Sequence, residues 1–322
     1  MRIGVITSGG DAPGMNACVA RLVTLGAERG HEVTGFRGGY PGILAGDSVE
    51  LRPAGTQGWY KLGGSVLKTG RLPSLVEEAT QVALVERLRG CKIDALVIIG
   101  GDGSFRGALD LSARTSEVKF IGIPGTIDNN IYGSDYTLGH DTALNKLVSY
   151  IDDISDTGMA LPGRVFFVET LGAFDSYLPQ SAVLMGMADF SVLYEPKTSN
   201  EEIAQKVLEF RKLVRRDYVL ATFAEGAQQM FDAADYVRQT LGLNVKCNLL
   251  GFAQRGGVPT ACDRLHASAF ALNAILALEA GAAGKYIVYK QGAYALLDFS
   301  FAAQKKQFDN YGFPEEAGIA PA

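Results

Sequence analysis

Short apolar runs alternate with longer amphipathic stretches along the first 140 residues of the chain. Four of these runs are rich in β-branched residues, and they predict strands at residues 3–7, 32–37, 94–101 and 119–125. Apolar residues recur at helical spacing over residues 13–30 and 73–90. This alternation predicts a mainly parallel sheet that is covered by helices on both faces.

The same alternation begins again from about residue 141. Strands are predicted at residues 164–170, 190–196 and 218–226, and in the segment 244–257, which ends in a glycine turn. Helices are predicted at residues 140–155, 200–216 and 261–281. We therefore expect an α/β fold of two three-layer domains with mainly parallel sheets, without a Pro- or Ser-rich linker between them.

Charge and cysteine usage exclude several classes of protein. The chain has 322 residues and a net charge of −5, and its acidic and basic residues are scattered. No block of one sign indicates nucleic acid or a membrane surface, and no apolar run is long enough to span a bilayer. The four cysteines show no CxxC spacing, which argues against a zinc site and fits a reducing compartment. We expect a soluble, cytoplasmic protein without a signal peptide.

Three glycine-rich turns follow predicted strands, which is where α/β sheets bind their ligands. SGGDAPGMN spans residues 8–16, IIGGDGSFRGA spans residues 98–108, and GIPGTIDNN spans residues 122–130. Glycines let backbone N–H groups approach a phosphate, although each segment alone could be an ordinary tight turn. Three such turns after three strands favour one phosphate-binding cleft.

Two carboxylates in these turns are candidates for a metal ligand and a general base. Asp102 could supply the carboxylate that Mg²⁺ takes beside phosphate oxygens, with Ser104 at the expected start of a helix. Asp128 would face the same cleft, where a carboxylate can act as general base for attack on a γ-phosphate, and Thr126 could bind the acceptor. The alternatives are structural, with Asp102 as a helix cap and Asp128 in an Asx-turn.

Four motifs together resemble those of one known family. SGGDAPGMN, GGDGS, PGTIDN and GFAQRGG-x-P-x₃-DR have the order and spacing of the ATP-dependent 6-phosphofructokinase family, over nearly the whole chain. The resemblance implies a nucleotide-binding domain of residues 1–140 plus about 256–305. It implies a sugar-phosphate-binding domain of residues 141–255 plus the C-terminal tail. The implied reaction transfers the γ-phosphate of ATP to the 1-hydroxyl of fructose 6-phosphate.

The resemblance also assigns site residues. For ATP it implies Gly10, Arg71, Gly101, Asp102, Gly103 and Ser104, with Asp102 as the Mg²⁺ ligand. For the sugar phosphate it implies Thr126, Ile127, Asp128, Arg164, Gly172, Glu225, Lys246, Phe252 and Arg255. Asp128 would be the general base, and Thr126 and Asp102 would complete the catalytic set.

The resemblance further implies a phosphoryl donor and an assembly. Pyrophosphate-using relatives have an aspartate and a lysine where this chain has Gly103 and Gly125, so ATP is favoured as the donor. The family builds its sugar site across a subunit interface. We therefore expect a homotetramer in which Arg164 and Lys246 come from a neighbouring chain.

The acceptor side departs from the family pattern. Ala173 replaces an arginine that offsets charge on the transferred group, Phe252 replaces a histidine, and Lys246 replaces an arginine. Lys68 is a candidate substitute cation. Two alternatives therefore stay open, namely a kinase for another phosphorylated ketose and a catalytically weak or non-catalytic nucleotide-binding paralogue.

Other departures lie elsewhere in the chain. Asn130 replaces an aspartate, and His140 adds a titratable group that we interpret first as a helix-end residue. Bacterial relatives bind effectors through basic residues at positions that here hold Ala20, Thr24, Pro53 and Ser155. Arg215 and Arg216 keep some positive charge. We expect a weak or absent response to the usual effectors.

Overall fold

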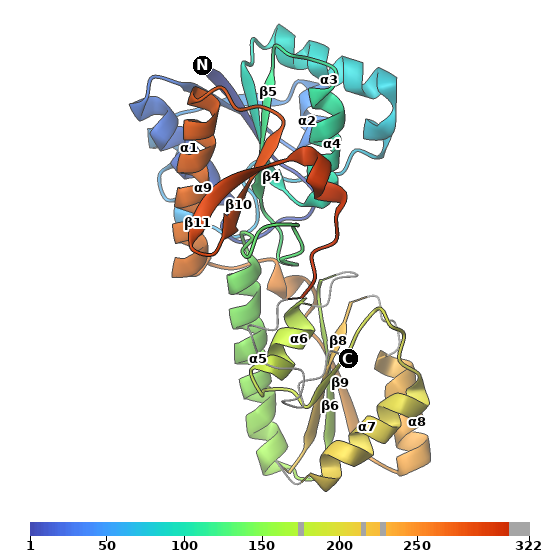
Figure 1. Cartoon of the computed structure of the whole chain (residues 1–322). Coiled ribbons are helices and arrows are strands. Elements are labelled where there is room, and N and C mark those ends of the chain that lie inside the picture. The colour runs from blue at the N-terminus through green and yellow to red at the C-terminus, as the bar shows by residue number, and fades with distance from the viewer. Residues whose placement is uncertain (173–176, 214–216, 226–229, 309–322) are drawn as a thin grey trace. The chain divides into compact units, whose positions relative to one another are not determined.

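The computed structural model describes residues 1–172, 177–213, 217–225 and 230–308, which form two compact units (Figure 1). The first unit comprises Met1–Thr142 and Arg255–Lys306. The second comprises Ala143–Gln254 and the segment that starts at Gln307. The tail after Phe308, which is expected in the second domain, lies outside the described residues.

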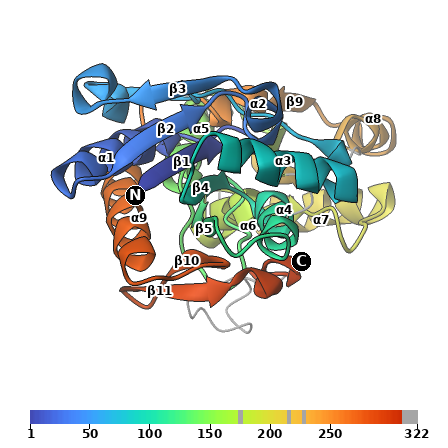
Figure 2. The ribbon, with the colours of Figure 1, turned by 90° about the horizontal axis from the view of Figure 1, so that it is seen from above.

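A seven-stranded sheet forms the centre of the first unit, in the order β11-β10-β5-β4-β1-β2-β3 (Figure 2). Its strands are β1 (Arg2–Thr7), β2 (Glu32–Phe36), β3 (Ser48–Leu51), β4 (Ala95–Gly100), β5 (Lys119–Pro124), β10 (Lys285–Lys290) and β11 (Ala293–Asp298). The five inner strands are parallel, and the two edge strands run antiparallel to their neighbours.

Helices cover both faces of this sheet (Figure 2). One layer contains α1 (Met15–Glu28) and α9 (Ala261–Glu279), and the other contains α2 (Tyr40–Ala45), α3 (Glu78–Gly90) and α4 (Asp102–Ser112). Short 3₁₀ helices lie at Pro53–Thr56, Trp59–Lys61, Pro73–Val76 and Phe299–Ala303. The strands β4 and β5 are almost fully buried, because the two helical layers leave no solvent-facing side.

The second unit has a four-stranded parallel sheet in the order β7-β8-β6-β9. Its strands are β6 (Val165–Thr170), β7 (Phe190–Val192), β8 (Val219–Ala224) and β9 (Val245–Leu249). Its helices are α5 (His140–Ala160, which begins in the first unit), α6 (Tyr177–Leu184), α7 (Asn200–Lys212) and α8 (Met230–Leu241), with a 3₁₀ turn at Gly251–Gln254. Ser199 and Glu202 form a capping box that starts α7.

The two mainly parallel sheets, covered by helices, confirm the predicted α/β class. The predicted strands at residues 3–7, 32–37, 94–101 and 119–125 correspond to β1, β2, β4 and β5. The strand expected at 190–196 is shorter and ends at Val192. The predicted helix at 73–90 begins with a separate 3₁₀ turn before α3. Within the described part of the chain, no helix is long and apolar enough to cross a membrane.

Candidate functional site

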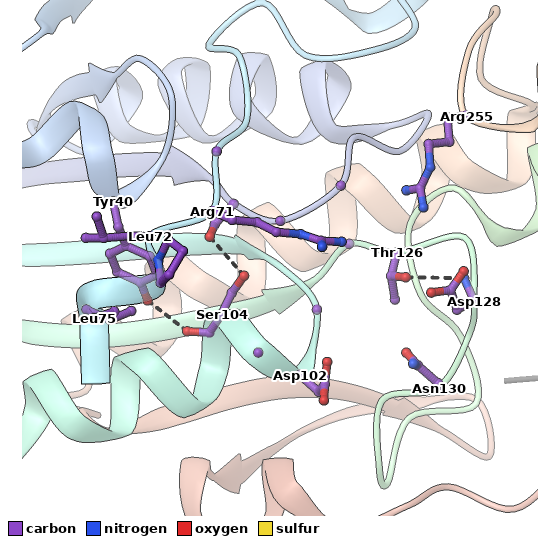
Figure 3. Close-up of a pocket in the computed structure, with 18 residues that line it drawn as sticks. Tyr40, Arg71, Leu72, Leu75, Asp102, Ser104, Thr126, Asp128, Asn130 and Arg255 are labelled. Carbon is purple, nitrogen blue, oxygen red and sulfur yellow. Dashed lines mark hydrogen bonds between the residues drawn. The ribbon is translucent and has the colours of Figure 1, made fainter. Parts of the chain in front are cut away.

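A cavity of about 390 Å³ lies at the carboxyl ends of β1, β4 and β5 in the first unit (Figure 3). The chain proceeds from β1 to β2 in one direction along the sheet and from β4 to β5 in the other. The cavity therefore lies at the topological switch point of the sheet, where open α/β sheets bind their ligands. All three glycine-rich turns contribute to its lining.

The first turn brings the backbone of Gly10 against an arginine. The Arg255 guanidinium donates to the carbonyl of Asp11 at 3.3 Å. A Cβ on Gly10 would lie 2.3 Å from Nη1 of Arg255, so a side chain there would displace the guanidinium. Glycine at this position thus lets a cation from the distant GFAQRGG motif line the cavity.

The second turn places Asp102 in the first turn of α4. The helix N-cap is Gly101, without a side-chain hydrogen bond, so the alternative of Asp102 as the capping residue is wrong. The Asp102 carboxylate is half-exposed and forms an ion pair with Arg106 at 3.1 Å, one helical turn further along. It lines the cavity and is accessible to a ligand there.

Ser104 connects the walls of the cavity. Its hydroxyl donates to Ser8 Oγ at 2.9 Å, and its carbonyl accepts from the Tyr40 hydroxyl at 2.8 Å. Tyr40, Leu72 and Leu75 form an apolar wall at one end of the cavity (Figure 3). Sequence reasoning missed these three residues, although Leu72 directly follows Arg71 and Tyr40 follows a glycine pair.

The third turn places Thr126 and Asp128 at the charged end of the cavity, near Arg255 (Figure 3). The Thr126 hydroxyl accepts from the amide of Asp128 at 3.2 Å, and the Thr126 carbonyl accepts from the hydroxyl of Thr137 at 2.6 Å. Figure 3 shows Arg71 extending across the cavity toward Thr126. Ile127, in contrast, is fully buried and its side chain does not line the cavity.

The two glycines that bear on the phosphoryl donor differ in their surroundings. A Cβ on Gly125 would lie 2.9 Å from the Ile99 side chain, so packing alone already favours glycine there. A Cβ on Gly103 would have its nearest neighbour, Arg106, at 3.9 Å. Packing against neighbouring atoms therefore does not require glycine at position 103, and the space beside it is open.

No group of three or more His, Cys, Asp or Glu side chains in the described ranges could hold a metal ion without other ligands. Mg²⁺ in phosphate-transfer sites takes only one or two carboxylates and completes its shell with phosphate oxygens and water. Asp102 and Asp128, which line the same cavity, fit that donor set. A phosphorylated ligand would have to supply the remaining oxygens.

His140 begins α5, and its ring Nδ1 lies 2.8 Å from the carbonyl of Ile127. Burial lowers the pKa of His140 from 6.5 to about 4, with the nearby Lys306 charge adding to the shift. The imidazole is therefore neutral at pH 7, and Nδ1 must carry the proton that it donates to Ile127. His140 is a helix-end residue that fixes the turn beside Asp128.

This buried histidine should make stability depend on pH. Its folded pKa of about 4 lies below the unfolded value of 6.5, so its contribution is present above pH 6.5 and is lost as the pH falls toward 4. The loss amounts to about 3 kcal/mol at pH 4. We expect the melting temperature of the wild type to fall several °C further between pH 7 and 4 than that of His140→Asn, whose amide nitrogen takes the place of Nδ1 and can still donate to Ile127. Parallel pH profiles for the two proteins would contradict this.

The second unit contains the remaining predicted sugar-phosphate residues. Arg164 precedes β6 and Lys246 lies on β9, directly opposite Phe166 in the parallel register. Because side chains alternate along a strand, Arg164 and Lys246 extend from the same face of this sheet. Two cations on one face suit a phosphate.

Glu225 and Gly172 also meet in the second unit. The amide of Gly172 donates to Glu225 Oε2 at 3.4 Å, and the Gln254 side-chain oxygen accepts from the amide of Leu171 at 2.6 Å. The Leu171–Gly172 turn is thus held at both residues. Burial and the neighbouring Glu225 charge raise the pKa of Glu169.

The acceptor-side departures have different surroundings. Phe252 is 82% exposed in the 3₁₀ turn at Gly251–Gln254. Ala173 lies outside the described residues. Lys68 has an exposed side chain and a left-handed backbone with φ 56°, and it does not line the cavity. Nothing in the described structure therefore supports Lys68 as the substitute cation.

A second cavity, of about 340 Å³, lies beside α1 in the first unit. It is lined by Ala20, Thr24 and Pro53, three of the positions where the family resemblance implies that basic effector ligands are replaced. Arg21 and Arg264 also line it, but Arg21 donates to Ser268 and Arg264 to the Pro259 carbonyl. Ser155 lies in the second unit, and Arg215 and Arg216 lie outside the described residues.

The large cavity is apolar at one end and charged at the other, a combination that suits a phosphorylated ligand with an apolar group. The phosphofructokinase family model matches residues 2–278. The ATP-dependent 6-phosphofructokinase of Aquifex aeolicus is 33% identical over 99% of this chain and 100% of its own length. ATP-dependent 6-phosphofructokinase 1 of Thermus thermophilus is 37% identical over 95% of each chain. The chain therefore belongs to the phosphofructokinase family.

The fold agrees with this assignment. The crystal structure of Pichia pastoris phosphofructokinase in the T-state superposes with a TM-score of 0.86 at 28% sequence identity. The superposition covers 94% of this chain and 37% of the longer Pichia chain.

Proposed function

We propose that this chain is an ATP-dependent 6-phosphofructokinase, which transfers the γ-phosphate of ATP to the 1-hydroxyl of fructose 6-phosphate. The observation that supports this most is the convergence of the three glycine-rich turns on one cavity that also contains Asp102, Asp128, Arg71 and Arg255. A phosphoryl-transfer site needs this combination of phosphate-binding backbone, cations and a carboxylate base.

The cavity suits ATP along its length. The apolar wall of Tyr40, Leu72 and Leu75 offers a surface for the adenine ring, and Arg71 extends toward the charged end where phosphates would lie. The open space beside Gly103 leaves room for a nucleotide. These features favour ATP over pyrophosphate, which has no group to fill the apolar end.

In the proposed reaction Asp128 accepts the proton of the 1-hydroxyl as that oxygen attacks the γ-phosphate. Arg71 and Arg255 offset the charge that spreads over the transferred group. Asp102, with Asp128 nearby, would hold Mg²⁺, which when bound neutralises charge on the phosphates. Thr126 orients the amide of Asp128 and lies where it can contact the acceptor.

The roles of the two units are part of the proposal. The first unit would bind the nucleotide, and the second would supply Arg164, Lys246 and Glu225 for the sugar phosphate. We further infer a homotetramer that shares the sugar site between subunits, as the family resemblance implies. The free cysteines fit the reducing cytoplasm.

A substrate panel tests this function. We expect the purified protein to give its highest kcat/KM with ATP and fructose 6-phosphate, with a kcat of about 1 s⁻¹ or more. Pyrophosphate should be a far poorer donor. A higher kcat/KM with another phosphorylated ketose would favour the alternative that the chain is a kinase for that sugar phosphate. The altered Lys246 and Phe252 motivate this alternative. ATP binding without turnover on any sugar phosphate would contradict both.

A further inference from the structure

The turn that contains Asp128 is held on both sides by side chains from outside it. The carbonyl of Ile127 accepts from the His140 ring at 2.8 Å. The carbonyl of Asn129 accepts from the ammonium of Lys306, also at 2.8 Å. The peptide before Asp128 and the peptide between Asn129 and Asn130 are therefore both held, and Lys306 reaches this turn from 177 residues further along the chain.

Asn129 has a left-handed backbone conformation, with a φ of 51°. Among non-glycine residues asparagine tolerates this region best, and hydrogen bonds to the residue help to keep it there. Its side-chain amide donates to the carbonyl of Asp135 at 3.2 Å. The Lys306 bond holds the backbone carbonyl of the same residue. Without that bond, the peptide between Asn129 and Asn130, one residue beyond Asp128, has one fewer restraint against rotation.

Lys306 is itself held in place by the chain that precedes it. The preceding 3₁₀ helix, Phe299–Ala303, buries Phe299 and Ala302 in the core of the first unit. The ammonium therefore has a defined place beside the turn. The positive charge of Lys306 also disfavours protonation of His140 and so helps to lower the pKa of that histidine.

We propose that Lys306 is a positioning residue for the reaction, and that it acts by fixing the Asn129 carbonyl and, through it, the direction of the Asp128 carboxylate. This proposal rests on the proposed function, because it assigns Lys306 to the base of that reaction. A misplacement of about 1 Å in a reacting group can lower a rate by roughly 100-fold. A lysine remote in sequence thereby governs the proton-accepting step without contacting the substrate.

Three full-length variants test this. We expect Lys306→Met to lower kcat roughly 10- to 100-fold while KM for ATP stays within about twofold. Lys306→Arg should restore most of the rate, because its guanidinium can also donate to the Asn129 carbonyl. Lys305→Met is the matched control, since Lys305 is the adjacent, exposed lysine, and its kcat should be unchanged. A general loss of packing would instead change KM for ATP and would not be rescued by arginine.

The two proposals fail in different ways. If Asp128→Asn retains full turnover, the assigned base is wrong and the proposed mechanism fails. If Asp128→Asn is nearly inactive but Lys306→Met keeps the wild-type kcat, only the Lys306 proposal fails. In the Asp128→Asn background we expect Lys306→Met to cause no further loss, because both act on the same step. A full additional loss there would overturn the positioning role.

Discussion

Asp128→Asn is expected to lower kcat by roughly 10²- to 10⁴-fold, the range that a general base contributes. The amide has nearly the shape of the carboxylate but cannot accept the proton of the sugar hydroxyl. The hydrogen bond from the Asp128 amide to Thr126 is a backbone contact and survives the change. ATP affinity, measured by equilibrium titration, should therefore stay within about threefold of the wild type, since this side chain is only one of many that line the cavity.

The control for this variant is an aspartate remote from the cavity. Asp152 is exposed on α5 in the second unit, so Asp152→Asn changes the same chemistry without touching the site. Its kcat should match the wild type. Wild-type turnover in Asp128→Asn would mean that another group accepts the proton.

Asp263→Ala is expected to destabilise the first unit strongly, because it removes an acceptor shared by four donors, three of them buried. The carboxylate is fully buried on α9 and accepts from the Tyr136 hydroxyl, the Gly139 amide, and both the amide and the hydroxyl of Thr142. Burial raises the pKa of Asp263, and the donors oppose that shift. Unsatisfied buried donors cost about 1–3 kcal/mol each.

The expected loss of at least about 3 kcal/mol corresponds to a fall in melting temperature on the order of 10 °C for a unit of this size. Differential scanning calorimetry measures it. Glu279→Ala provides a control on the same helix, because Glu279 pairs with Arg29 and His31 at the surface. That variant should melt close to the wild type, since exposed ion pairs add little to stability. Equal shifts in the two variants would contradict the role given to burial.

The elements that could be predicted are those in which the apolar residues of the sequence are also the residues that the fold buries. Strands β4 and β5 are short apolar runs that both helical layers cover, so their composition alone indicates them. Helix α8 was missed although its buried Met230, Ala233, Ala234 and Val237 have helical spacing. Two of these four are alanines, which weaken the apolar signal of the face.

The hairpin of β10 and β11 was missed for another reason. Strand β11 pairs only with β10 and contains no buried residue, although residues 293–297 form an apolar run that does indicate a strand. Gln291 and Gly292 at the turn both have positive φ, as a two-residue hairpin turn requires, but only the glycine gives a local signal.

The cavity could be predicted in part for the same physical reason. The three turns follow β1, β4 and β5, and the carboxyl ends of adjacent parallel strands share one edge of a sheet. The contact between Lys306 and Asn129 could not be predicted from local sequence, because only tertiary folding brings these two residues together. The apolar wall from Tyr40 to Leu75 likewise depends on how α2 and the 3₁₀ turn at Pro73–Val76 pack.

The divided first unit also has a consequence for biosynthesis. Its earlier part, Met1–Thr142, lacks Arg255, Asp263 and the strand β10 that pairs with β5. The whole four-stranded sheet of the second unit lies between residues 165 and 249 and is translated before any of these. Since domains fold as units while the chain emerges, we expect the second unit to mature on the ribosome while the first waits for its last strands. The nucleotide cavity would thus be the last part of the molecule to form, and nascent chains that stop short of β10 should not bind ATP.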